Sequence, residues 1–397
     1  MQDKAELPNS CEQLLCAMIG FDTVNGLVSG RVEAERPLAE YLMSVARQWG
    51  FAVQDLPVEG QAPNLLITHE VKAGAPWLVF DSHMDTVDVA GMTVDPFQAK
   101  STAGANGKIY GRGACDTKGT GAAMLWALRQ YAGERNGAAN IAVLFSVDEE
   151  CGMTGADAFA RIHLRQLDWD PVGVVVGEPT MMKLVTGSNG VVRWKIRTTG
   201  VATHSSSPAR GRSAISDMIR VVDALESRYI PSLQAQHPMT GQACCSINII
   251  HGGVQVNIIP ESCSIDIDRR LVPGEDGRSV LPAVEKILDD VRMQHPQLQV
   301  KQDQPRIVEP HDPAVGKLFA EKVGAVLAPA GFDPQPTGAP YGTNGNRYGP
   351  QGIPTVILGP GSIDQAHTKD EWLSVKQLHL GVQGYYQLMS APAKSWT

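Results

Sequence analysis

The run from Trp77 to Thr86 places a histidine and an aspartate directly after an apolar segment. Residues 77–80 have the pattern of a short buried strand, which would bring His83 and Asp85 to its carboxyl end. A neutral histidine nitrogen is a common metal ligand, and a nearby carboxylate can hold the other ring nitrogen and fix its tautomer. The same pair could also end a strand in ordinary hydrogen bonds. This stretch alone leaves both interpretations open.

Other acidic residues and a second histidine follow apolar segments in the same way. These further candidates are Asp116, Glu149, Glu150, Glu178 and His367. Open α/β sheets bind their ligands at the carboxyl ends of the strands, so we expect five such segments to bring their donors together at one end of one sheet. Because the donors are nitrogen and oxygen without thiolates, the set favours zinc, cobalt or manganese in an open, catalytic site.

Asp116 and two neighbouring cysteines can also be explained without a metal. Cys115 and Cys151 each adjoin an acidic candidate and could be thiolate ligands, but we expect both to pack as small apolar groups. Asp116 could simply cap the small-residue helix expected at 121–131. The glycines at 111 and 113 do not form a dinucleotide loop, because Asp116 would put an anion where a phosphate must sit.

Length and composition indicate a protein of two domains. A chain of 397 residues exceeds what one hydrophobic core usually serves. Its formal net charge of -8 argues against a nucleic-acid partner. The apolar runs are too short for a membrane span, and the first residues do not resemble a secretory signal. Seven cysteines without a regular framework favour reduced thiols, so we expect a cytoplasmic protein with no membrane partner.

Helical and strand-like patterns alternate at both ends of the chain, as in α/β domains. The middle third instead follows the order strand, helix, two strands, helix, strand, which is ferredoxin-like. We therefore predict an α/β catalytic domain with a mixed sheet, formed by residues 1–186 and 305–397, and an inserted α+β domain at 187–304. The expected helices outside the insertion are 11–19, 32–49 and 121–131, and the strands are 51–53, 64–67, 77–80, 141–147, 172–177 and 353–358.

Taken together, these motifs resemble the M20 family of metallohydrolases over nearly the whole chain. The matching segments are Ser82–Val87, Gly111–Gly119, Asp148–Glu150, Gly177–Thr180, Thr203–Ser206, and Gly359–Gly361 with His367. The resemblance implies a zinc-hydrolase fold whose inserted domain acts as a lid and dimerisation domain. It also implies a hydrolase that acts on linear amide or peptide bonds.

The resemblance gives each donor a metal-binding role. It implies that Asp116 bridges two divalent cations, with zinc favoured over cobalt and manganese. One cation would be held by His83 and Glu178, and the other by Glu150 and His367. We therefore expect two metal ions as cofactors.

The same resemblance makes Glu149 the general base and Asp85 the residue that orients His83. The chemistry agrees with these roles. Two cations can share a water, lower its pKa and polarise the scissile carbonyl. A carboxylate that is not a ligand can then take the proton of the water and pass it to the leaving amine.

In the inserted domain, the residues that match the family's substrate contacts are His204, Asn257 and Arg270. Arg270 is suited to a bidentate grip on a substrate carboxylate, but it could instead form a surface ion pair with Asp268 or Glu275. Asn257 could be a turn residue and His204 an ordinary loop histidine. In dimeric relatives the matching histidine reaches the partner's active site, so we expect a homodimer formed through the inserted domain.

Gly342 and Thr343 complete the expected substrate-binding set. The residues after them, 344–346, depart from the family, where an acidic residue often follows Gly-Thr, and this puts recognition of a cationic amine in question. The favoured substrate is an N-acyl-L-amino acid, as in acetylornithine deacetylase. Alternatives are succinyl-diaminopimelate desuccinylase, a carboxypeptidase or dipeptidase that takes short peptides, and, outside the enzymes, a non-catalytic module that binds metal or peptide.

Overall fold

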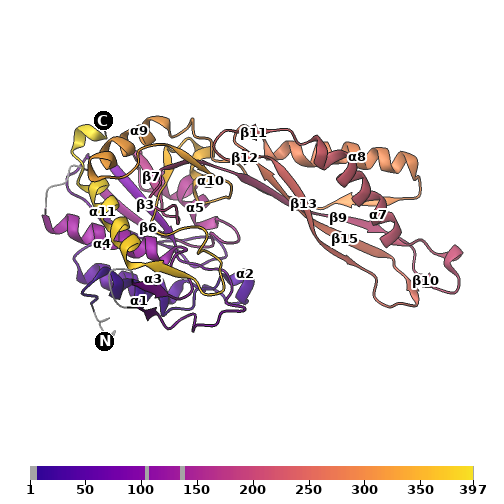
Figure 1. Cartoon of the computed structure of the whole chain (residues 1–397), viewed down its shortest axis with the longest axis horizontal. Helices are drawn as coiled ribbons and strands as arrows, with labels where there is room; N and C mark the ends of the chain where they lie inside the picture. The colour runs from indigo at the N-terminus through magenta and orange to yellow at the C-terminus, as the bar shows by residue number, and fades with distance from the viewer. Residues whose placement is uncertain (1–6, 103–106, 135–138, 397) are drawn as a thin grey trace. The chain divides into compact units, whose positions relative to one another are not determined.

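The computed structural model describes residues 7–102, 107–134 and 139–396, and the chain divides into two compact units (Figure 1). Unit 1 contains Met1–Thr186, Asp312–Gly338 and Thr343–Thr397. Unit 2 contains Gly187–His311 and Ala339–Gly342. Unit 2 thus includes the segment predicted as an insertion and continues to His311. Among the described residues, no helix has the length and apolar character that a membrane crossing requires.

A mixed sheet of eight strands forms the centre of unit 1 (Figure 1). In spatial order its strands are β1 (Ala52–Leu56), β2 (Asn64–His69), β6 (Asn140–Ser146), β3 (Trp77–His83), β7 (Gly173–Val176), β19 (Thr355–Ile357), β8 (Val185–Ser188) and β18 (Thr337–Ala339). Strands β6, β3, β7 and β19 run parallel to one another, whereas β1, β2 and β8 pair antiparallel with their neighbours. The parallel strands are buried, which explains their nearly continuous apolar runs.

Strands and helices together form the core of unit 1. Phe80 and Phe145 come from the sheet, and Leu14, Leu42 and Tyr385 come from helices. The longer helices are α1 (Cys11–Ile19), α3 (Arg36–Gln48), α4 (Lys118–Glu134), α9 (Lys317–Leu327) and α11 (Val375–Ser390). The shorter helices are α2 (Gly26–Ser29), α5 (Thr154–Ala158), α6 (Leu164–Gln166) and α10 (Gly345–Tyr348), with a π-helical turn at Phe159–His163 and 3-10 turns at Ala328–Ala330, Gly349–Gln351 and Ala393–Ser395.

Two helix starts show where the sequence pattern was sufficient and where it was not. Helix α1 has the predicted limits, and the Ser10 side chain caps it by accepting from the Gln13 amide. Helix α3 begins at Arg36, so the predicted start at residue 32 was wrong. Pro37 lies in its first turn, where the fixed φ of proline fits and its missing N–H costs nothing.

The strand that leads into the loop of Asp116 belongs to a separate three-stranded sheet. It consists of β20 (Trp372–Ser374), β5 (Lys108–Tyr110) and β4 (Lys100–Ser101), all antiparallel. The expectation that Asp116 follows a strand of the main sheet was therefore wrong. Its loop runs from β5 of this small sheet to helix α4.

Unit 2 has the predicted ferredoxin-like order. Its antiparallel sheet consists of β13 (Cys244–Gly252), β15 (Ser262–Leu271), β9 (Gly190–Thr199) and β16 (Gln299–Gln302), with β17 (Arg306–Val308) also paired to β9. The helices are α7 (Ala214–Ala224) and α8 (Val280–Gln294). The smaller elements are β10 (Thr203–His204), β14 (Ile258–Ile259), β11 (Gln236–His237), β12 (Gly241–Gln242), a π-helical turn at Leu225–Tyr229, and 3-10 turns at Pro208–Arg210, Ile230–Ser232 and Gly277–Ser279.

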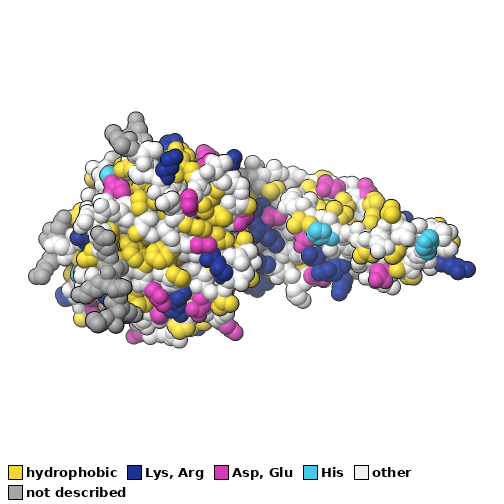
Figure 2. Space-filling view, turned by 90° about the horizontal axis from the view of Figure 1, so that it is seen from below, with side chains coloured by type: hydrophobic (Ala, Val, Ile, Leu, Met, Phe, Trp, Pro, Cys, Tyr) yellow, Lys and Arg dark blue, Asp and Glu magenta, His cyan; other side chains and the backbone are white. Residues whose placement is uncertain are grey.

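The two faces of the unit 2 sheet differ in character. Along β9 the buried residues Trp194 and Ile196 alternate with charged residues, as in a sheet with one packed face and one solvated face. On the solvated face Arg193 pairs with Asp268 on β15, at 2.8 Å between Nε and Oδ2. Figure 2 shows basic and acidic side chains next to one another on unit 2. This face is therefore partly neutralised by its own ion pairs.

Candidate metal centre

Three neighbouring parallel strands bring four of the candidate donors to one edge of the sheet. His83 is the last residue of β3, Glu149 and Glu150 follow β6 after two residues, and Glu178 follows β7 after one. The register places His83 opposite Ser146, the last residue of β6. Because parallel strands end at the same edge, their following residues are delivered to one place.

The remaining two donors come from loops. Asp116 lies between β5 and α4, and His367 lies in the loop between β19 and β20. Both reach the edge where β3, β6 and β7 end, because His367 Nε2 is 3.1 Å from Glu150 Oε1 and Asp116 Oδ1 is 3.0 Å from His83 Nε2. The structure thus brings together all five residues predicted to bind metal.

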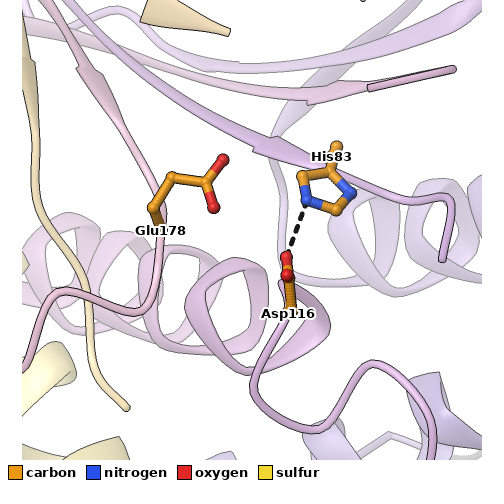
Figure 3. A group of neighbouring side chains, drawn as sticks. All are labelled: His83, Asp116 and Glu178. Carbon is orange, nitrogen blue, oxygen red and sulfur yellow. Dashed lines mark hydrogen bonds and ion pairs between the residues drawn. The ribbon is translucent and has the colours of Figure 1, made fainter. Parts of the chain in front are cut away.

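Asp116 belongs to two groups of potential ligands. One group is His83, Asp116 and Glu178, and the other is Asp116, Glu150 and His367; within each, the donor atoms lie within 4.8 Å of one another. In Figure 3 the carboxylate of Glu178 and the ring of His83 point toward the space beside Asp116. The two Asp116 oxygens separate the groups, since Oδ2 is 3.2 Å from His367 Nε2 while Oδ1 faces His83.

The charge of this cluster fits divalent cations. The side chains of Asp116 and Glu150 are only 7% and 8% exposed, and Glu178 is also buried. Burial and the nearby Asp116 carboxylate raise the pKa of Glu178 well above its ordinary value. Like charges gathered away from water must take up protons or be compensated by cations. The nitrogen and oxygen donors match the preferences of zinc and manganese.

The two imidazoles respond to the same carboxylates. Burial alone would lower the pKa of His83, but its hydrogen bonds with Asp116 and Asp85, together with the nearby carboxylate charges, outweigh burial and raise the pKa well above the ordinary value. Hydrogen bonds with Asp116 and Glu150 raise the pKa of His367 to about 11. Burial would raise the pKa of Asp116, yet the two histidines hold it below its usual range. In the metal-free protein His367 is thus protonated at neutral pH, and a cation would replace its proton.

Glu149 differs from its neighbour Glu150. Among the described residues it belongs to neither group of donors, although it is only 8% exposed. Burial, together with the adjacent Glu150 carboxylate, raises the pKa of Glu149 well above its ordinary value. A buried carboxylate with a raised pKa, beside a metal site but outside the ligand set, suits a general base.

Asp85 contacts more than the histidine that it was predicted to orient. His83 Nδ1 is 2.9 Å from the main-chain oxygen of Asp85 and 3.5 Å from its carboxylate. The carboxylate accepts from the amides of Glu149 and Glu150 at 2.9 and 3.1 Å, and from Asn25 Nδ2 at 2.8 Å. The main chain of Asp85 therefore faces the histidine, while its side chain holds the segment with the candidate base.

Neither group of donors among the described residues includes a cysteine. Cys115 is buried, and its Sγ lies 3.5 Å from the main-chain oxygen of Ser362. Cys151 is partly buried. Cys115 thus packs in the core of unit 1, whereas the packing of Cys151 stays a prediction.

The loop that departs from the family is turned inward. The Asn344 side chain is buried and donates to Asp81 Oδ2 at 3.0 Å and to Ser146 Oγ at 2.9 Å. Thr343 is also fully buried, and its Oγ1 accepts from the Gly345 amide at 3.1 Å. The amide nitrogen of Asn344 thus has structural partners in Asp81 and Ser146.

Within unit 2 the structure brings His204 and Asn257 together. His204 on β10 lies opposite Ile258 on β14, and the Ser205 amide donates to the main-chain oxygen of Asn257 at 3.0 Å. Both residues are exposed, and His204 Nδ1 lies 2.8 Å from Ser206 Oγ. The two side chains are therefore accessible beside one short antiparallel pair of strands, β10 and β14.

Arg270 is not near that pair of strands. It lies on β15 eight positions after Ser262, which corresponds to about 26 Å along the strand. Its Nε donates to Asp268 Oδ1 at 2.7 Å, which is the ion pair considered as the alternative to substrate binding. Arg270 nevertheless remains 31% exposed. Within unit 2, Arg270 and His204 thus occupy separate places.

Sequence reasoning missed the polar residues that hold the ligand loops, notably Asn25, Arg112 and Glu371. Arg112 lies between two glycines just before Asp116, and Glu371 follows His367 by four residues. Proximity to a candidate ligand was the only available signal. Their burial could not be known from the sequence.

Comparisons with known proteins agree with this architecture. Residues 79–391 match the sequence profile of Peptidase family M20/M25/M40. A protein of Emericella nidulans named a probable carboxypeptidase is 30% identical over 385 residues, covering 90% of this chain and 85% of the relative.

Two solved structures share the fold. A tripeptidase from Staphylococcus aureus has a TM-score of 0.76 at 21% identity, and the match covers 97% of this chain and 98% of the tripeptidase. A Bacillus subtilis protein described as a dinuclear metal-binding peptidase of the M20 family has a TM-score of 0.65 at 14% identity and covers 96% and 97%.

Proposed function

We propose that this chain, which belongs to peptidase family M20/M25/M40, is a two-metal carboxypeptidase of short peptides. One observation carries the proposal. The Asp116 carboxylate directs one oxygen toward His83, at 3.0 Å, and the other toward His367, at 3.2 Å. A carboxylate shared in this way between two groups of donors is suited to bridge two cations. Zinc is the favoured cation, with cobalt and manganese as alternatives.

The choice of substrate rests on the relatives and on the chemistry of one residue. The Emericella nidulans relative is named a probable carboxypeptidase. Arg270, which is partly exposed, is suited to bind the terminal carboxylate of a peptide in a bidentate manner. The comparisons do not support the narrower expectation of an acetylornithine deacetylase, whereas the carboxypeptidase alternative fits them. The bond broken is an amide in either case.

The reaction divides between the cations and Glu149. The chemistry that two cations supply when bound is a lower pKa for water and a polarised scissile carbonyl. Glu149 takes the proton of the attacking water and passes it to the nitrogen of the departing amino acid. The Asp85 carboxylate holds the Glu149 amide at 2.9 Å, which keeps this base beside the cluster.

His204 is proposed to donate to the carbonyl oxygen that gains negative charge during the attack. Because Arg270 lies about 26 Å along β15 from Ser262, while His204 pairs with Ile258 beyond the start of that strand, one site is not expected to take both from the same unit 2. A homodimer through unit 2 resolves this conflict, since each subunit can supply its His204 to the site of the other. Asn257, which lies next to the strand pair of His204, would enter the same site.

The compartment follows from the cysteines. No disulfide joins the seven cysteines, all of which lie in the part of the chain that the structure describes. Free thiols are typical of a reducing environment, which supports a cytoplasmic location.

A panel of substrates tests the proposed function. It contains dipeptides and tripeptides with a free or an amidated C-terminus, N-acetyl and N-succinyl amino acids, and N-acetylornithine, each assayed for released amine with added zinc. We expect hydrolysis of peptides with a free carboxylate and little of their amidated forms. Turnover confined to N-acetylornithine, or equal turnover of amidated peptides, would contradict a carboxypeptidase.

A further inference from the structure

Glu371 is a buried carboxylate that accepts hydrogen bonds from four donors of one loop. Its Oε1 accepts from the amides of Cys115 and Asp116 at 2.7 and 2.9 Å. Its Oε2 accepts from the Gly113 amide at 3.1 Å and from Arg112 Nη1 at 2.8 Å. The Glu371 side chain is only 1% exposed. One side chain thus accepts from three main-chain amides and one guanidinium nitrogen of the loop around Asp116.

The loop around Asp116 lies outside the sheets and the helices. It connects β5 and α4 without regular secondary structure, so no sheet or helix ladder pairs the amides of Gly113, Cys115 and Asp116. Buried main-chain N–H groups are costly unless they find an acceptor. The carboxylate of Glu371 supplies that acceptor, and it therefore fixes the path of the main chain at the residue that carries the shared carboxylate.

The same contacts tie this loop to the loop of His367. Glu371 comes four residues after His367, and its main-chain oxygen accepts from the Gly111 amide at 3.1 Å. Arg112 Nη2 also donates to the main-chain oxygen of Thr368, next to His367, at 3.4 Å. The segments that bring Asp116 and His367 to the centre are thus fastened to each other.

We propose that Glu371, assisted by Arg112, is a positioning residue that sets the affinity of the centre for its cations through the placement of Asp116. The inference rests on the proposed function, because it takes Asp116 as the shared ligand. Residues that hydrogen-bond to metal ligands typically change metal affinity by about 10- to 100-fold when they are replaced. Because Asp116 belongs to both groups of donors, both cations are expected to bind more weakly.

The substitution Glu371→Gln separates positioning from simple support of the fold. The amide has nearly the same shape, and its oxygen can still accept from one pair of donors. Its NH₂ group, however, must then face two other donors, which are the Gly113 amide and Arg112 or the amides of Cys115 and Asp116. The loop loses half of its acceptor while the core around it keeps its volume.

Unit 2 offers a matched control. Glu275 also joins an arginine to the main chain, because Arg269 Nη2 lies 2.5 Å from its Oε1 and the Val272 amide donates to its Oε2 at 2.9 Å. Glu275→Gln therefore makes the same chemical change at a carboxylate with the same kind of partners, but on a segment that carries no proposed ligand.

The test measures zinc binding by calorimetry with the metal-stripped full chain, together with circular dichroism and thermal melting of the metal-free form. We expect Glu371→Gln to bind zinc about 10- to 100-fold more weakly than the wild type, with the same metal-free circular dichroism spectrum. Glu275→Gln should bind zinc as the wild type does. Affinity of Glu371→Gln equal to that of the wild type would overturn the inference and leave the proposed function intact.

A second variant covers the case in which metal-free Glu371→Gln does not fold. Arg112→Lys keeps the positive charge, but one ammonium cannot reproduce the fork that joins Glu371 and Thr368. A folded Arg112→Lys protein with weakened zinc affinity would support the inference, and wild-type affinity would overturn it. A wild-type chain that binds no zinc, cobalt or manganese would overturn the proposed function, and the inference with it.

Discussion

The cluster in unit 1 and the candidate substrate residues of unit 2 differ in how firmly the chain holds them. Asp116 and His83 are buried and hydrogen-bonded, and neighbouring carboxylates bond the main chain beside them. His204 and Asn257 are exposed on a two-residue strand pair, and Arg270 is partly exposed and paired with Asp268. The first region is complete within one unit of one chain, whereas in the second Arg270 lies apart from the neighbouring His204 and Asn257.

This difference shows what each region needs to function. A metal centre needs its ligands fixed before the cations arrive, because the affinity depends on their geometry. Residues that grip a substrate can remain exposed and gain their partners when the substrate or a second subunit is present. The four predictions below separate these two kinds of residue, in order of decreasing effect.

The largest effect is expected in unit 1 from Glu149→Gln. Since Glu149 is outside both donor groups, the variant should keep both metals while kcat falls by about 10²- to 10⁴-fold. Metal analysis of the purified variant, alongside steady-state kinetics, provides the measurement. Loss of one metal equivalent would instead make Glu149 a ligand and reverse its assignment with Glu150.

In unit 2, His204→Ala should lower kcat by about 10²- to 10³-fold with little effect on folding, because an exposed donor to the oxyanion would be lost. His251→Ala removes another exposed histidine of the same unit and serves as the control. Steady-state kinetics and thermal melting of both variants provide the check. Equal losses in the two would argue against a specific role for His204.

Mixing subunits sharpens this prediction. Glu149→Gln and His204→Ala homodimers are both impaired, but a hybrid contains one site with both residues intact if His204 acts across the dimer. Activity should therefore return when the two variants exchange partners. No recovery after proven exchange would place His204 in the site of its own subunit.

Arg270→Ala tests the other end of unit 2. It should raise KM for peptides with a free C-terminus by about 10- to 100-fold, because a charge-assisted bidentate contact is lost. Arg193→Ala is a matched control, since Arg193 pairs with the same Asp268 at 2.8 Å. A similar rise in KM for both variants would mean that Arg270 acts only through Asp268.

Local features of the fold could be predicted from the sequence, whereas features that depend on distant residues could not. The strand before His83 and the helix after Ser10 were predictable, because apolar periodicity and capping residues are local signals. The path of the Asp116 loop was not, since its acceptor, Glu371, lies 255 residues away in the chain. Likewise, the separation of Arg270 from His204 depends on the register of the unit 2 sheet and not on any motif.

The smallest effect concerns pH. His83 and His367 both have raised pKa values in the metal-free protein, and an imidazole nitrogen must lose its proton to bind a cation. Zinc affinity should therefore rise with pH across the neutral range, and protons should be released on binding. Calorimetry in buffers of different ionisation enthalpy measures this release. Heats that do not depend on the buffer would contradict the assignment of these histidines.

Titrating the metal-stripped chain with zinc, while recording bound metal and peptide hydrolysis at each step, tests whether two cations are needed for hydrolysis. We expect no turnover without metal, and full turnover only as the second equivalent of zinc binds. Full turnover by protein that elemental analysis shows to be metal-free would contradict it.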